Sequence, residues 1–310
     1  MEQKEKKIES KIVLGIIIGV VVFIVFAFFG DVNVIFNTIL QIDTKSLILA
    51  LVIVCCSYII RFIKWNYLIN AINIKISFSE SFSIFFAGRA LSITPGKVGE
   101  LFKAYILKKR YKIDISYSSP AIIMEWFSDF FGILIIIGLS IFVFSYGYIL
   151  FFLALFFMLL ITAVLQSKKL SLRIIDYICK LSFLKKRRVQ IEQLYTTIFG
   201  LLGWKTLLYI IFLSSCSWFL EALSLYIITN TLGLSLSLLH NLFIFSLGTL
   251  TGAISMLPGG LGATEVSMTG LFLYFQIDKS TAISLTLIAR LVTLWLGVFI
   301  GLFFLLRYRD

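Results

Sequence analysis

Long apolar runs divide this sequence, and they constrain its fold more than any other feature. A helix needs about 20 mostly apolar residues to cross the hydrocarbon core of a bilayer. Six runs of the 310-residue chain approach or exceed that length: 12–29, 46–63, 119–143, 148–165, 206–229 and 281–306. The hydrophobic content of 60% and the mean hydropathy of +1.01 also lie outside the range of soluble domains. The sequence therefore predicts an all-α integral membrane protein with six full spans.

Two shorter apolar stretches, 81–94 and 241–257, run into Pro-Gly elements instead of charged loops. The first element is SITPGKVGE at 92–100, and the second is SMLPGGLGATE at 255–265. Proline ends a preceding helix, and glycine permits tight turns. Unpaired backbone groups are tolerated at membrane depth only when they are buried in protein or face a watery cavity. We therefore expect two re-entrant or broken helical hairpins whose tips border a polar cavity.

Matched spacing predicts that the two elements belong to related halves of one membrane domain. Val54, at the middle of one predicted span, precedes Pro95 by 41 residues, and Ser217 precedes Pro258 by the same number. Because an odd number of spans separates the two elements, they are entered from opposite faces of the membrane. We expect an inverted-topology repeat of this kind, with units 12–143 and 148–306.

Basic residues are concentrated in alternate segments between the runs, which predicts the orientation of the chain. Lys and Arg gather in five segments: 1–11, 61–80, 97–112, 166–205 and 306–310. Cytoplasmic loops retain positive charge, so both termini are expected in the cytoplasm of a multi-pass cell-membrane protein. Attraction to an anionic leaflet accounts for the net charge of +12, so no nucleic-acid partner is expected.

The basic segment 166–205 is an insertion in the second unit with the spacing of an amphipathic helix. We expect this helix to lie on the inner leaflet. Two roles remain open for it. Its charge serves only to orient the chain, or it recruits anionic lipid or a cytoplasmic transferase.

Ionisable residues within apolar segments are costly and therefore mark candidate functional sites. Glu125 and Asp129, four residues apart, share one face of a predicted helix. Helices that restart after the Pro-Gly elements would point amide donors at the cavity, which favours an anionic guest. The alternative is that the acids and bases only pair with one another, for example Arg290 with Glu265. The candidate substrate-binding residues are Arg89, Pro95, Gly96, Lys97, Gly99, Glu100, Glu125, Asp129, Glu221, Pro258, Gly259, Gly260, Gly262, Glu265 and Arg290.

Residues for metal, cofactor or nucleophilic chemistry are scarce. The single histidine, His240, lies at the outer end of a predicted membrane segment. The four cysteines have neither metal-ligand spacing nor a disulfide framework. The glycines at 259–262 lack the Gly-Lys-Ser/Thr of a P-loop, so no ATP site is expected. The sequence predicts a protein that is not an enzyme and has no cofactor or metal.

Four segments carry a family resemblance: TPGKVGELFKAYIL at 94–107, EWFSD at 125–129, LPGGLGATE at 257–265 and ARLVTLWLG at 289–297. They resemble the lysylphosphatidylglycerol synthase transmembrane-domain family of flippase-like membrane proteins, and the resemblance covers essentially the whole chain. Its motifs commonly read Pro-Gly-x-x-Gly-Glu, Glu-Arg-x-x-Asp, and Pro-Gly-Gly-x-Gly followed by Glu. Every candidate residue except Arg89, Lys97 and Glu221 matches position by position. Trp126 stands where the family usually has arginine, which removes a cation beside Glu125.

The resemblance implies a protein that handles or moves polar lipids. In this family the domain can be fused to an aminoacyl-transferase. This chain ends four residues past its last apolar run, so lipid aminoacylation by it is not expected. Our hypothesis is that a phosphate-bearing headgroup enters the cavity, where half-helix amides, Arg89 and Arg290 hold the anion. The carboxylates would hold a cationic moiety, a coupling proton or ion, or the basic residues themselves.

Two alternatives to lipid movement remain open. The chain could be a secondary transporter of a small anionic solute, which uses the same repeat architecture. It could also be a non-catalytic membrane partner of a lipid-modifying or glycosyl-transferring enzyme.

Overall fold

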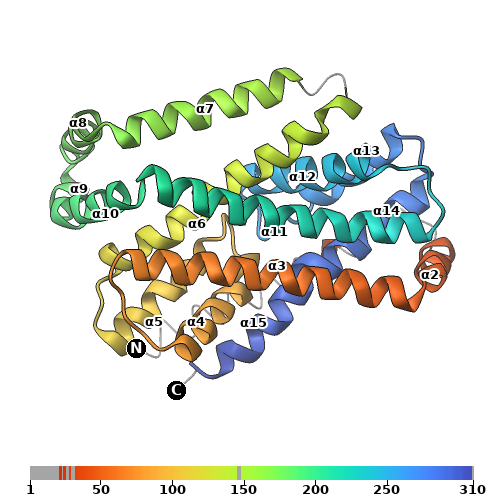
Figure 1. Ribbon diagram of the computed structural model, residues 1–310, viewed down its shortest axis with the longest axis horizontal. Coiled ribbons are helices and arrows are strands. Elements are labelled where there is room, and N and C mark those ends of the chain that lie inside the picture. The colour runs from red at the N-terminus through yellow and green to blue at the C-terminus, as the bar shows by residue number, and fades with distance from the viewer. Residues whose placement is uncertain (1–20, 23, 26–27, 29–31, 145–147, 309–310) are drawn as a thin grey trace.

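The computed structural model describes residues 21–22, 24–25, 28, 32–144 and 148–308, and its regular elements there are all helices (Figure 1). Among the described residues, four helical segments are long and apolar enough to cross a membrane: α3 (Thr44–Ala71), α6 (Ile115–Ser140) with its 3-10 extension η3 (Ile141–Val143), α11 (Trp204–Thr231), and α14 (Lys279–Arg290) continued by the π-helical turn η4 (Leu291–Trp295) and α15 (Leu296–Leu306). They coincide with the predicted spans at 46–63, 119–143, 206–229 and 281–306. The predicted span at 12–29 falls largely outside the described residues.

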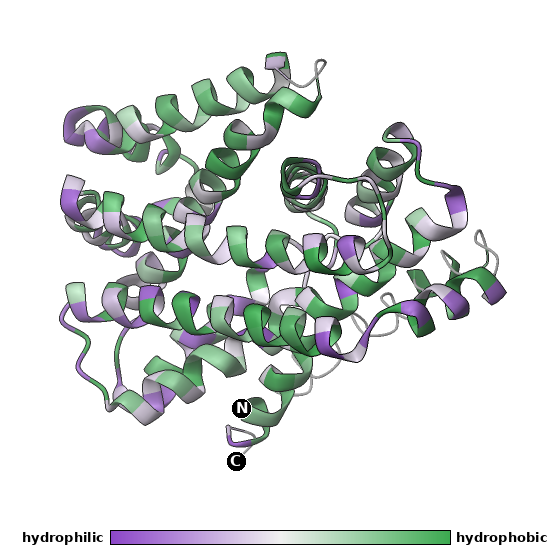
Figure 2. Cartoon of the chain, turned by 45° about the vertical axis from the view of Figure 1, so that its right-hand side comes forward, coloured by the Kyte–Doolittle hydropathy of each residue, from purple (hydrophilic) through white to green (hydrophobic). Residues whose placement is uncertain are grey.

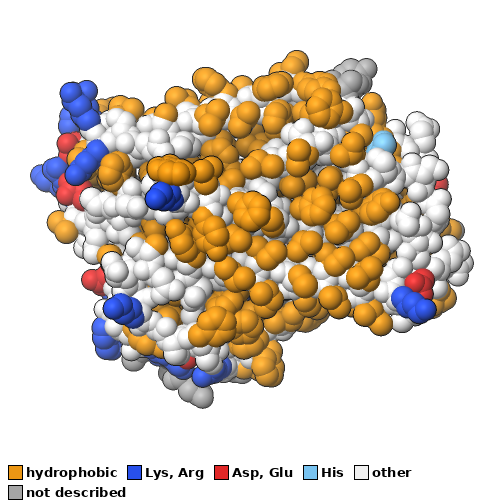
Figure 3. Space-filling view, in the orientation of Figure 1, with side chains coloured by type: hydrophobic (Ala, Val, Ile, Leu, Met, Phe, Trp, Pro, Cys, Tyr) orange, Lys and Arg blue, Asp and Glu red, His pale blue; other side chains and the backbone are white. Residues whose placement is uncertain are grey.

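α7 (Tyr148–Gln166) follows the apolar run predicted at 148–165 and lies along one edge of the bundle (Figure 1). It meets α8 (Lys168–Ile178) at an angle of 91°, so the pair counts as a fifth span only if both are taken together. α9 (Ser182–Lys185) and α10 (Arg188–Leu201) complete the inserted segment. Blue side chains gather at this end of the molecule, while hydrophobic ones cover its middle (Figure 3). The hydropathy of the helices has the same distribution (Figure 2).

Two broken helical hairpins stand where the Pro-Gly elements predict them. Hairpin one comprises α4 (Phe78–Ala90), η1 (Leu91–Ile93), η2 (Val98–Leu101) and α5 (Phe102–Tyr111). Hairpin two comprises α12 (Leu238–Ile254) and α13 (Ala263–Tyr274), which pack against each other. The short helix α2 (Val32–Gln41) packs against α14.

The tips of the two hairpins contact each other. Pro95 and Pro258 form an antiparallel backbone bridge, and the amide of Gly96 donates to the carbonyl of Met256 at 3.2 Å. Gly259 and Gly260 have φ angles of 59° and 68°, a region that glycine enters without steric cost. The Pro-Gly elements therefore end their helices and also join the halves of the chain.

Small residues let the helices around the tips approach closely, as is usual between membrane helices. A Cβ atom at Gly301 of α15 would lie 2.7 Å from the carbonyl oxygen of Phe86 on α4. A Cβ atom at Gly132 of α6 would lie 2.9 Å from the carbonyl carbon of Ser214 on α11. These contacts hold α4, α6, α11 and α15 around one central region.

Candidate functional site

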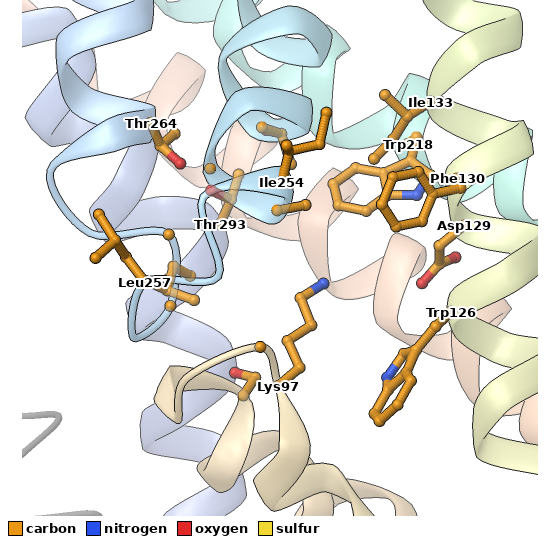
Figure 4. A pocket seen from close by; sticks show the side chains of 18 of the residues that line it. Lys97, Trp126, Asp129, Phe130, Ile133, Trp218, Ile254, Leu257, Thr264 and Thr293 are labelled. Carbon is orange, nitrogen blue, oxygen red and sulfur yellow. The ribbon is translucent and has the colours of Figure 1, made fainter. Parts of the chain in front are cut away.

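A cavity of about 440 Å³ lies in this central region, between the hairpin tips and helices α6 and α11 (Figure 4). Its apolar wall includes Trp126, Phe130 and Ile133 of α6 and Trp218 of α11. Eight of the candidate residues line it: Arg89, Gly96, Lys97, Asp129, Glu221, Gly259, Gly260 and Arg290. The structure thus places residues from both Pro-Gly elements and from distant helices around one space.

A much smaller polar chamber of about 20 Å³ shares several of these walls. Glu100 and Glu125 line this chamber and not the larger cavity. The five remaining candidates line neither space: Pro95, Gly99, Pro258, Gly262 and Glu265. Four of these belong to the turns of the hairpin tips, and Glu265 lies in the first turn of α13.

α3 brings two buried cations to the acids of α6 and α11. The guanidinium of Arg61 lies 3.0 Å from Oε1 of Glu221 and 3.2 Å from Oδ2 of Asp129. The ammonium of Lys64 lies 2.6 Å from Oδ1 of Asp129 and donates to the hydroxyl of Ser214. Glu221 and Asp129, which the sequence marks as candidates for binding substrate, are therefore already engaged by protein cations.

Lys103 forms a third buried pair, with its ammonium 2.5 Å from Oε2 of Glu125. The ammonium also lies over the ring of Trp65, 4.5 Å from its centroid. A cation therefore accompanies Glu125 although Trp126 replaces the usual arginine. The indole Nε1 of Trp126 instead donates to Oε2 of Glu100 at 3.1 Å.

Arg61, Lys64 and Lys103 are at most 5% exposed, although the segments 61–80 and 97–112 were expected to be cytoplasmic. These three buried cations therefore do not indicate which loops face the cytoplasm, and the predicted orientation depends on the other basic residues. Arg61 lies inside the apolar run 46–63, and Lys64 is three residues further on the same helix face. A cation within or directly after an apolar run was the sequence signal that could have identified Arg61 and Lys64 as residues of the site.

Arg290 and Glu265 form the pair that the sequence analysis offered as an alternative to substrate binding. Nε of Arg290 lies 2.7 Å from Oε1 of Glu265, and its Nη2 donates to the carbonyl of Gly259 at 2.6 Å. The other carboxylate oxygen of Glu265 accepts the amide of Gly262 at 2.6 Å. Both residues therefore support the turn of hairpin two, whatever else they contact.

The backbone amides of the first tip are not free for an anion, which corrects that part of the hypothesis. Lys97 and Val98 donate to the carbonyls of Thr94 and Pro95, and Gly99 donates to the hydroxyl of Thr94 at 2.7 Å. Gly96 donates across to hairpin two. The backbone amides of the turn already donate to acceptors in the protein, among them the hydroxyl of Thr94. Side chains must therefore supply any anion contacts at this tip.

Metal-binding groups are absent from the part of the chain that the structure describes: no cluster there holds three or more His, Cys, Asp or Glu residues suited to a metal. His240 pairs with the hydroxyl of Ser237 at 2.7 Å and lies away from the cavity. The site is a mixed apolar and ionic cavity, suited to holding a polar group.

Comparison with known sequences places the chain in a family. The family described as the lysylphosphatidylglycerol synthase TM region matches residues 12–301. A UPF0104 membrane protein of Pyrococcus horikoshii is 26% identical over 315 residues, covering 87% of this chain and 89% of the relative. One of Methanocaldococcus jannaschii is 26% identical over 318 residues, covering 95% and 94%. A third, of Methanothermobacter thermautotrophicus, is 38% identical over 120 residues, which is only 36% of each protein. The chain is a membrane protein that belongs to the lysylphosphatidylglycerol synthase TM region family.

Proposed function

We propose that this protein binds the headgroup of an anionic or phosphate-bearing lipid in the cavity and moves it between the leaflets of the cell membrane. The main observation in support of this proposal is that the cavity contains buried charges and has an exposed apolar rim. The lining includes Val98, Ile254, Met256 and Leu257, each at least 45% exposed. A headgroup can enter past such a rim while its acyl chains stay in lipid.

The apolar rim favours a lipid over a small soluble anion. A soluble ion sheds its water before it crosses an apolar rim, and it gains no contact there in return. A volume of about 440 Å³ suits a headgroup and not a whole diacyl lipid. The family's name, which refers to lysylphosphatidylglycerol, is consistent with this class of ligand.

Alternating exposure supplies the mechanism in this proposal. The two hairpins are the re-entrant elements of an inverted repeat, with both termini in the cytoplasm. Pro95 and Pro258 join the two tips, and in this mechanism the tips part and re-form as a headgroup passes. The ion pairs of Arg61, Lys64 and Lys103 keep the helices around the cavity in place while the tips move. The protein acts as a transporter and catalyses no covalent change.

A vesicle assay tests the proposal. The full chain is reconstituted into liposomes that contain phosphatidylglycerol with a fluorophore on one acyl chain, and dithionite is added outside. We expect dithionite to reach label from the inner leaflet only in vesicles that contain protein. Ala253→Trp fills the cavity and should slow this movement, whereas Ala154→Trp on α7, outside the cavity lining, should not.

Inner-leaflet label that stays protected in vesicles with folded wild-type protein would contradict lipid movement. Uptake of radiolabelled phosphate or glycerol phosphate by the same vesicles would instead identify a solute transporter. Equal activity of the Ala253→Trp and wild-type proteins would show that lipid does not pass through this cavity.

A further inference from the structure

The cations around the two chambers fall into two groups. Four have a carboxylate within 4.0 Å: Arg61, Lys64, Lys103 and Arg290. Arg89 and Lys97 have none among the described residues, although both line the cavity. Unpaired charge at membrane depth is costly, so these two side chains need a further explanation.

Arg89 has donor capacity that the protein does not use. It lies in the last turn of α4, with its guanidinium over the ring of Tyr58 at 4.9 Å. Its Nε is buried without a hydrogen-bond partner among the described residues. One helical turn later, the hydroxyl of Ser92 is also buried without a partner, and Ser92 lines the same cavity. Buried donors without a partner are rare in folded proteins, so both groups are available to an acceptor on a ligand.

Lys97 extends from the tip of hairpin one into the cavity, toward Trp218 and Phe130 (Figure 4). Its ammonium lies 5.8 Å from the ring centroid of Trp218. Its φ of 56° is in the left-handed region, which is sparsely populated by residues other than glycine and is common at ligand clamps. Arg89, Ser92 and Lys97 therefore all bring donors to the cavity from hairpin one.

The total charge indicates which anion fits. Among the described residues, six cations line the two chambers or pair with their acids, namely the two unpaired and the four paired ones above. Five carboxylates accompany them: Glu100, Glu125, Asp129, Glu221 and Glu265. Six positive and five negative charges leave one positive charge. A single negative charge on a ligand would balance the site.

We infer that Arg89, Ser92 and Lys97 form the anion subsite of the cavity, and that the subsite takes a phosphodiester with one negative charge. Guanidinium, hydroxyl and ammonium groups are donors, and the two unesterified oxygens of a phosphodiester are acceptors. A phosphomonoester brings up to two charges and leaves the site negative. The inference rests on the proposed function only in assigning the phosphodiester to a lipid headgroup.

Lipid binding to the purified full chain in detergent tests the subsite. The probes are dioleoyl phosphatidylglycerol, which is a phosphodiester, dioleoyl phosphatidic acid, which is a monoester, and uncharged dioleoylglycerol. We expect wild type to bind the phosphodiester most tightly. Arg89→Gln and Lys97→Gln should each weaken that binding at least about tenfold. Lys108→Gln, on the exposed face of α5, is the matched control and should bind as wild type does.

The variant Ser92→Ala distinguishes a loss of lipid affinity from a loss of protein stability. It removes a buried hydroxyl that has no partner, so the thermal stability of the unliganded protein should stay equal or rise. Its affinity for dioleoyl phosphatidylglycerol should nevertheless fall. A loss of affinity in Ser92→Ala therefore does not come from misfolding.

Two results would overturn the subsite. Wild-type affinity for dioleoyl phosphatidylglycerol in both Arg89→Gln and Lys97→Gln would place the anion elsewhere. Tighter binding of dioleoyl phosphatidic acid would contradict the charge count. Equal binding of the soluble phosphodiester glycerophosphoglycerol would instead leave the subsite in place and overturn its assignment to a lipid, and the proposed function with it. The vesicle assay reports movement and not binding, so a failure to move lipid is distinguishable from a failure of the subsite.

Discussion

A backbone-to-backbone contact between α15 and α4 gives a quantitative prediction for Gly301→Ala. The new Cβ would lie 2.7 Å from the carbonyl oxygen of Phe86, 2.9 Å from Cα of Ala90, and nearer still to the amide of Ala90. Non-bonded heavy atoms prefer about 3.5 Å or more, so α15 and α4 must separate by about 1 Å. All three atoms belong to the backbone and cannot rotate away.

Overpacking of this kind typically costs about 1–3 kcal/mol. We therefore expect Gly301→Ala to lower the free energy of unfolding in detergent by that amount. Gly270→Ala is the matched control, since it lies on an exposed face of α13 and its Cβ would meet no atom within 4 Å. An alanine there should be neutral or stabilise by about 0.5–1 kcal/mol.

Thermal unfolding followed by intrinsic tryptophan fluorescence measures both variants. Equal stability of Gly301→Ala and Gly270→Ala would show that α15 and α4 have room for a Cβ atom at Gly301. A second consequence follows from the position of Arg89 beside Ala90 on α4. Displacement of α4 should therefore also weaken binding of phosphatidylglycerol by Gly301→Ala.

Three further predictions concern the ion pairs, the surface and the subsite. Arg61→Gln leaves Glu221 buried and should lower the free energy of unfolding by about 3–5 kcal/mol. The double variant Arg61→Gln/Glu221→Gln should lose less stability than the two single variants added together, which a double-mutant cycle of unfolding free energies measures. Partial burial raises the pKa of Asp278, but hydrogen bonds from Thr281 outweigh it and hold that pKa below its ordinary value. The ionised Asp278 should therefore stabilise the folded protein above about pH 4, and this stabilisation should be lost as the pH falls through the pKa of Asp278 in the folded state. Asp278→Asn should remove this pH dependence of the melting temperature. Gly297→Ala would place a Cβ 3.0 Å from both the Arg89 guanidinium and the Tyr58 hydroxyl, so it should displace Arg89 and weaken phosphatidylglycerol binding while leaving the charge of the site unchanged; unaltered affinity would show that Arg89 keeps its position.

Local sequence is sufficient to predict the class of protein and the places where its helices break. Apolar runs predict α3, α6, α11 and the α14–α15 segment because hydropathy is a property of each local stretch. The helix ends near Pro95 and Pro258 are predictable for the same reason, since a missing amide hydrogen acts on its own helix.

Which charges are paired and which remain for a ligand depends on the folded arrangement of the helices. Nothing local distinguishes Lys103, which pairs with Glu125, from Lys97, which has no carboxylate within 4.0 Å among the described residues. The free amides expected at the first tip are likewise occupied once Thr94 folds over them. An ion pair or a hydrogen bond forms only where the fold brings both partners within a few ångströms, and that distance is not encoded in spacing along the chain.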